Sequence, residues 1–187
     1  MSRCHVLVVG GTGMLAECCS FLARRGDTVT VLGRRQSRID RVIAMCPTGQ
    51  CEGIAVDYRH DRVTIEALEG VTERRGPFDE TVCWVHEEQA PLAHIYFGQL
   101  TGRSFYHVLS SQFADPANPA RLSELRRRFQ ESVPGVAYKT IILGFVPGMF
   151  GSRWLTNDEI SSGVFAAVER EAEQSVIGKV DPWKSRP

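Results

Sequence analysis

Short apolar runs alternate with amphipathic stretches along the whole sequence, and no linker or repeat separates them. The apolar runs predict strands at residues 6–9, 28–32, 52–57, 80–85, 104–109, 136–146 and 175–180. Apolar positions at helical spacing predict helices between them, at residues 15–25, 37–46, 61–75, 91–101 and 119–132, with a last helix that starts at a capping box, 156–159. Apolar strands that alternate with helices are typical of a parallel sheet covered on both faces. We therefore expect one doubly wound α/β domain over residues 1–187, with about seven strands.

A glycine turn joins the first strand to the first helix. Gly10 permits a tight turn, Gly13 lets the backbone approach a pyrophosphate, and small Ala16 lets the helix pack closely on the strand. The pyrophosphate would then accept hydrogen bonds from free N–H groups at the helix N-terminus. The spacing favours a dinucleotide cofactor, whose candidate contacts in the turn are Gly10, Thr12, Gly13, Met14 and Leu15.

The end of the second strand indicates which dinucleotide is bound. This position faces the adenosine ribose in such folds, and a carboxylate there would bind the 2′-hydroxyl of NAD. The sequence instead has Gly33, Arg34 and Arg35. Because forked guanidinium donors suit a phosphate, Arg34 and Arg35 favour NADP over NAD.

Composition excludes several function classes. Lysine plus arginine and aspartate plus glutamate both total 22, so no global charge favours nucleic acid or a membrane surface. The arginines of residues 121–128 leave an RNA-contacting module as a minor alternative, against which the neutral charge weighs. No signal peptide and no membrane-length apolar run occur, so we expect a cytoplasmic protein. The six cysteines lack metal-ligand spacing, and we expect no metal site.

The sequence resembles the short-chain dehydrogenase/reductase family over nearly its whole length, and the tract 152–157 also resembles small bacterial members of that family. The matching positions are the turn 10–15, Arg34, Asp57, Ser110 with Ser111, Pro147 with Gly148, and the helix start 156–160. The resemblance implies a Rossmann fold and a nicotinamide cofactor. It also implies that Asp57, with Tyr58 beside it, meets the adenine, that the serine assists the substrate carbonyl, and that Pro147-Gly148 borders the nicotinamide.

The family's catalytic pair, Tyr-x-x-x-Lys, occurs nowhere in this sequence. The expected helix carries Ser-Glu-Leu-Arg-Arg-Arg at residues 123–128 instead. Tyr138 and Lys139 supply both side-chain types, but they begin a strand and are expected at the wrong edge of the sheet. His86 ends the fourth strand at the ligand-binding edge, and its imidazole has a suitable pKa for protonating an alkoxide. We therefore predict His86 as the proton donor, with Ser111 as its helper.

Two functions stay open on the sequence alone. The first is an NADP-dependent oxidoreductase with a non-standard proton donor and an unidentified small-molecule substrate. The second is a catalytically inactive protein that senses NADP(H) or serves as a partner subunit. A homo-oligomer is compatible with either. Because arginines crowd the helix at 119–132, we expect that helix to stay out of any symmetric dimer seam.

Overall fold

A computed structural model describes residues 4–85, 90–149 and 151–187. Within those ranges, seven parallel strands form one sheet in the order β3-β2-β1-β4-β5-β6-β9. In chain order the strands are β1 (His5–Val9), β2 (Thr28–Gly33), β3 (Cys51–Ala55), β4 (Phe78–Cys83), β5 (Thr101–Ser110), β6 (Ala137–Leu143) and β9 (Gln174–Ile177). The doubly wound parallel fold expected from the sequence is confirmed.

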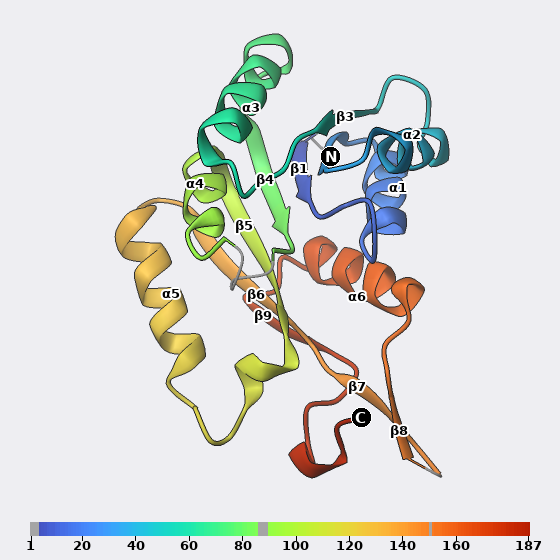
Figure 1. Ribbon diagram of the computed structural model, residues 1–187, viewed down its shortest axis with the longest axis vertical. Helices are drawn as coiled ribbons and strands as arrows, with labels where there is room; N and C mark the ends of the chain where they lie inside the picture. Colours follow the sequence, from blue (N-terminus) through green and yellow to red (C-terminus); the bar gives the residue numbers. More distant parts are fainter. Residues whose placement is uncertain (1–3, 86–89, 150) are drawn as a thin grey trace.

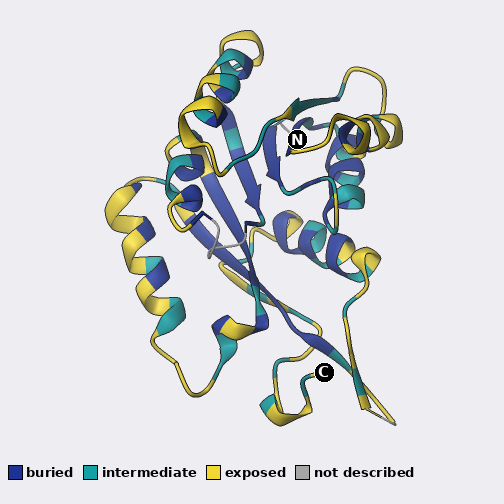
Figure 2. Cartoon of the chain, in the orientation of Figure 1, coloured by how far each residue is buried: buried dark blue, intermediate teal, exposed yellow. Residues whose placement is uncertain are grey.

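Helices cover both faces of the sheet (Figure 1). They are α1 (Ala16–Arg25), α2 (Gln36–Met45) and α6 (Asn157–Glu169) on one face, and α3 (Asp61–Arg75), α4 (Ala93–Gln99) and α5 (Arg121–Ser132) on the other. The strands alternate between the two cores, as β1 illustrates: Val6 and Val8 pack under α1 and α6, whereas Leu7 and Val9 pack under α3 and α4. Figure 2 shows the resulting pattern of a buried sheet between helices whose outer faces are exposed. No helix in the described ranges is both long and apolar enough to cross a bilayer.

The predicted sixth strand, 136–146, is wrong at its end. β6 stops at Leu143, and β7 (Phe145–Gly148) and β8 (Gly151–Trp154) pair as an antiparallel hairpin that the sequence did not suggest. The break lies at Gly144, where a Cβ atom would come within 2.1 Å of the carbonyl oxygen of Lys179. Only glycine allows that approach, and the chain passes from β6 to the hairpin at this residue.

The capping box at the start of α6 is confirmed. The Thr156 side chain accepts a hydrogen bond from the backbone N–H of Glu159, and the Glu159 carboxylate accepts one from the backbone N–H of Thr156. The Arg153 guanidinium also binds Glu159 with two contacts of 2.8 Å. These bonds fix how the hairpin is joined to α6.

Tyr138 and Lys139 lie at the amino edge of the sheet, as expected. They pair with Phe105 and Tyr106, whereas the carboxyl ends of the two strands meet at Ser110 and Leu143. The Tyr138 hydroxyl is paired with His107 at 2.7 Å, inside the core. These two side chains therefore do not replace the missing Tyr-x-x-x-Lys pair.

Candidate functional site

The glycine turn is built by close backbone packing. Gly10 has φ of +78°, and a Cβ atom there would lie 2.7 Å from the carbonyl oxygen of Trp84. Its N–H donates to the carbonyl oxygen of Leu32 at 3.3 Å, which ties the turn to β2. At Gly13, by contrast, no atom lies within 4 Å of the Cβ position. The turn is thus packed on its sheet side and open at Gly13.

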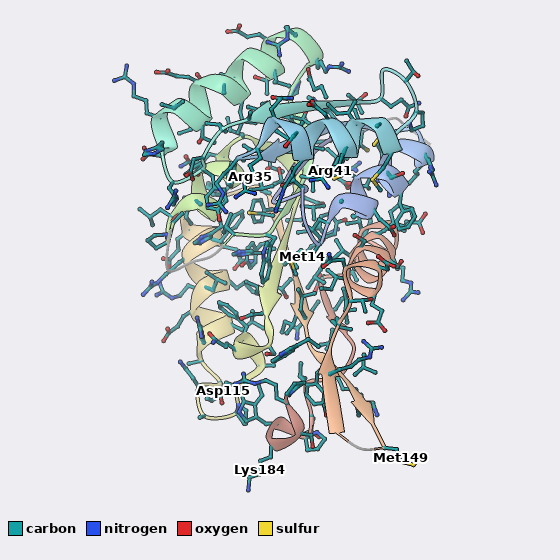
Figure 3. All side chains as sticks on the ribbon, turned by 45° about the vertical axis from the view of Figure 1, so that its right-hand side comes forward. Met14, Arg35, Arg41, Asp115, Met149 and Lys184 are labelled. Atoms are coloured by element: carbon teal, nitrogen blue, oxygen red, sulfur yellow. The ribbon has the colours of Figure 1, made fainter. Side chains whose placement is uncertain are left out.

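The N-terminus of α1 carries no side-chain cap. Leu15 occupies the N-cap position without a side-chain hydrogen bond, so the first N–H groups of the helix are not capped by its own side chain. The Ser161 hydroxyl of α6, which is 1% exposed, donates to the carbonyl oxygen of Met14 at 2.8 Å. α6 therefore holds the turn in place. Figure 3 shows Met14 in the middle of the molecule.

Thr12 and Arg34 lie beside Gly33 at the end of β2. A Cβ atom on Gly33 would meet the Thr12 methyl group at 2.6 Å, so the missing side chain makes room for Thr12. Arg34 and Arg35 are both exposed, and Arg35 is the N-cap residue of α2 (Figure 3). The two guanidinium groups are available to a ligand at this end of the turn.

Asp57 lies two residues beyond the end of β3 and is half-buried. Its carboxylate binds Arg59, whose Nε lies 3.0 Å from each carboxylate oxygen. The Arg59 hydrogen bonds, with a contribution from the charge of Arg34, lower the pKa of Asp57 to about 2. The neighbouring Tyr58 accepts a hydrogen bond at its carbonyl from the Tyr96 hydroxyl at 2.6 Å. Asp57 is consequently ionised, and the charge of Arg34 acts on it.

A cavity of about 450 Å³ opens at the carboxyl edge of the sheet, where β1, β4, β5 and β6 end. We call it the edge pocket. Its lining residues are Met14, Trp84, Ser110, Ser111, Gln112, Leu143, Gly144, Trp154, Leu155, Asn157, Ile160 and Arg186. The cavity therefore touches the glycine turn through Met14 and the end of β5 through its serines. Open parallel α/β sheets bind ligands at this edge.

Of the two candidate catalytic residues, the structure describes Ser111 but not His86. Ser111 begins a short 3₁₀ helix, η1 (Ser111–Ala114), is 5% exposed and lines the edge pocket. His86 lies outside the described residues. Pro147 and Gly148 are exposed on β7 and are not among the described residues that line the edge pocket. Of the residues that line it, none is a histidine, carboxylate, tyrosine, lysine or cysteine in the described part of the chain.

The sequence did not reveal several residues of the edge pocket, namely Trp84, Gln112, Trp154, Asn157 and Arg186. Trp154 and Arg186 come from the hairpin and from the segment after β9, both of which need the tertiary fold to reach the sheet edge. Trp84 directly follows β4, so its position at the carboxyl end of a predicted strand was a usable signal. Ser161 was missed for the same reason as the distant residues, since its partner Met14 comes close only in the folded chain. Arg59 lies two residues from Asp57, so its spacing was a usable signal.

Comparison with solved structures identifies the fold. The chain is similar to a short-chain dehydrogenase from Bacillus anthracis, with a TM-score of 0.73, 13% identity, and coverage of 94% of this chain and 95% of that chain. A short-chain dehydrogenase from Streptomyces avermitilis gives a TM-score of 0.69 and 15% identity, covering 95% of this chain and 89% of that one. A short-chain dehydrogenase/reductase from Serratia marcescens gives a TM-score of 0.68 and 15% identity, covering 92% of this chain and 94% of that one.

Protein-family models and curated proteins give no match to the sequence. At identities this low the structural likeness establishes the fold, and the chain has the short-chain dehydrogenase/reductase fold over nearly its whole length. The resemblance drawn from the sequence motifs is confirmed at that level.

Proposed function

We propose that the chain is an oxidoreductase that binds NADP(H) at the glycine turn and reduces a small carbonyl compound in the edge pocket. The observation that carries this proposal is the position of the pocket. It adjoins the glycine turn at Met14 and contains Ser111, the residue that matches the family's substrate-assisting serine. A cofactor and a substrate placed on these residues would be next to each other.

The residues of the turn fit a dinucleotide. The open space at Gly13 would admit a pyrophosphate, and the start of α1 has no side-chain cap from its N-cap residue, Leu15. Arg34 and Arg35 would hold the 2′-phosphate, and the adenine would lie near Asp57 and Tyr58. The two arginines favour NADP over NAD, because neither residue that follows Gly33 carries a carboxylate.

Ser111 and His86 would carry the remaining chemistry. When bound, NADPH supplies a hydride for the carbonyl carbon and leaves as NADP⁺, and the carbonyl oxygen takes a proton to become an alcohol. Ser111 would hydrogen-bond and orient that oxygen. His86 would donate the proton, because the described lining of the pocket offers no acid with a pKa near neutrality.

Calorimetry tests the cofactor assignment. We expect wild-type protein to bind NADP⁺ at least about tenfold more tightly than NAD⁺, since charge-assisted hydrogen bonds to phosphate contribute roughly 1.5–3 kcal/mol each. Arg34→Ala removes most of that preference. Arg41→Ala, an exposed arginine of α2, is the matched control and leaves it unchanged (Figure 3). Equal affinities for the two cofactors in the wild type would refute the assignment.

A second candidate function is a protein that binds NADP(H) without turnover. It is favoured by the missing Tyr-x-x-x-Lys pair and by the lack of an acid in the described pocket lining. Oxidation of NADPH with a panel of aldehydes, ketones and imines separates the two candidates. If the chain is an enzyme, His86→Ala lowers turnover about 10²–10⁴-fold and Ser111→Ala lowers it less, with NADP⁺ affinity preserved in both.

A further inference from the structure

The segment after β9 returns to the carboxyl edge of the sheet. Lys179 pairs with Phe145, with both backbone N–H to carbonyl distances at 2.8 Å. Gly178 has φ of +76°, and a Cβ atom there would lie 2.7 Å from the carbonyl oxygen of Phe145. This close crossing at the start of the hairpin directs residues 180–187 toward the edge pocket, beside β7 and β8 (Figure 1).

Arg186 is the charged side chain that this segment brings to the edge pocket. Its guanidinium lies 4.4 Å from the centre of the Trp183 ring, and its backbone N–H donates to the Trp183 carbonyl at 3.3 Å. Trp183 belongs to the short helix η2 (Trp183–Ser185). No carboxylate of the described residues forms an ion pair with Arg186. The guanidinium is therefore positioned, and no carboxylate in the described part of the chain neutralises it.

The rest of the described lining is uncharged. Its polar groups are serine hydroxyls and the amides of Gln112 and Asn157, whereas Trp84 and Trp154 supply large flat apolar surfaces. A single cation among uncharged groups creates a positive potential inside a concave site. A guanidinium binds a carboxylate through two parallel hydrogen bonds, which neither an alcohol nor an amide can match. The chemistry of the pocket thus suits a flat apolar molecule that carries one carboxylate.

We propose that the substrate of the edge pocket is a small planar carbonyl compound bearing a carboxylate, and that Arg186 binds that carboxylate. This inference rests on the proposed function for the reaction, but the anion site itself is a property of this chain's own residues. Arg186 would be a specificity-determining residue: it would select the carboxylate, while Ser111 orients the reacting carbonyl.

Benzoate and benzamide test the proposal directly, because they share one ring and differ in charge. We expect calorimetry to show that the wild-type protein binds benzoate at least about tenfold more tightly than benzamide. Arg186→Gln abolishes this preference, and Arg186→Lys restores part of it. Lys184→Gln is the matched control, because Lys184 is exposed on η2, two residues before Arg186, and does not line the pocket (Figure 3). The melting temperature of each variant shows whether it is folded.

Equal binding of benzoate and benzamide to the wild type would overturn the proposal, as would a preference that survives Arg186→Gln in the folded variant. NADP⁺ affinity, measured separately on the same variants, distinguishes this inference from the proposed function. Normal NADP⁺ binding without a benzoate preference overturns the anion site alone. A benzoate preference that depends on Arg186, in a protein that does not bind NADP⁺, supports the anion site and refutes the oxidoreductase.

Discussion

Acidification is expected to destabilise the fold through buried histidines, among them His94 of α4. His94 is 4% exposed, and neither ring nitrogen has a hydrogen-bond partner among the residues that the structure describes. Its ring stacks on that of His107 with 5.2 Å between centres, and it borders a cavity of about 680 Å³ whose described lining comes mainly from α3, α4 and α5. Burial lowers the pKa of His94 from 6.5 to about 4 and also lowers the pKa of His107.

The sign and size of the effect follow from these pKa values. Between pH 6.5 and 4 the unfolded chain binds a proton at His94 that the folded chain does not, so the free energy of unfolding falls as the pH falls. From pH 7 to pH 5, this difference in proton binding at His94 alone lowers the free energy of unfolding by roughly 2 kcal/mol. Asp57 and Glu159, whose pKa values are lowered to about 2, lose their contributions only below about pH 4.5.

Urea unfolding at pH 7 and pH 5 measures this difference. In His94→Gln, we expect the loss of stability between the two pH values to shrink by about 2 kcal/mol, because glutamine does not titrate. His60→Gln removes an exposed histidine and should keep the wild-type difference. An unchanged loss in His94→Gln would refute the reasoning, whatever that variant's stability at pH 7.

Three other outcomes are expected. Ser161→Ala should weaken NADP⁺ binding several-fold and lower stability by about 1 kcal/mol, because it removes the hydrogen bond to the Met14 carbonyl; a change in stability with unaltered affinity would contradict a role in holding the turn. Gly10→Ala should cost about 1–3 kcal/mol in thermal or urea unfolding, since its φ of +78° and its approach to Trp84 both disfavour a Cβ atom. If the protein dimerises, α5 should stay outside the seam, and efficient crosslinking between cysteines placed on the α5 helices of two subunits would show otherwise.

Much of the fold was predictable because its strands are buried on both faces. β1 carries an unbroken apolar run, and the apolar residues of β1, β2 and β4 are shared between the two cores. Helical spacing between these strands marks α1 and α3. The hairpin was not predictable in the same way. Apolar residues continue past Gly144, and the strand ends there because the backbone of Lys179 crosses that point.

The candidate site likewise contains residues that a local sequence pattern predicts and residues that only the tertiary fold brings to it. The turn at residues 10–15 has a local sequence pattern, and the structure brings Met14 and Ser111 to one pocket as the strand ends suggested. Arg186 reaches that pocket only through the crossing of Lys179 and Phe145, which no local pattern encodes. Cofactor choice and the proton donor remain predictions, and His86 lies outside the described residues.

The hydrogen bond between Ser161 and Met14 joins residues 147 positions apart in the chain. α1 and α6 also pack together, with Phe21 and Phe165 ring centres 5.5 Å apart. During synthesis the glycine turn therefore leaves the ribosome long before the helix that supports it. A nascent chain that ends before α6 would present the glycine sequence without its support and should retain no cofactor. On the proposed function, capture of the cofactor would thus follow docking of α6, and bound ligand would stabilise only molecules in which α6 supports the turn.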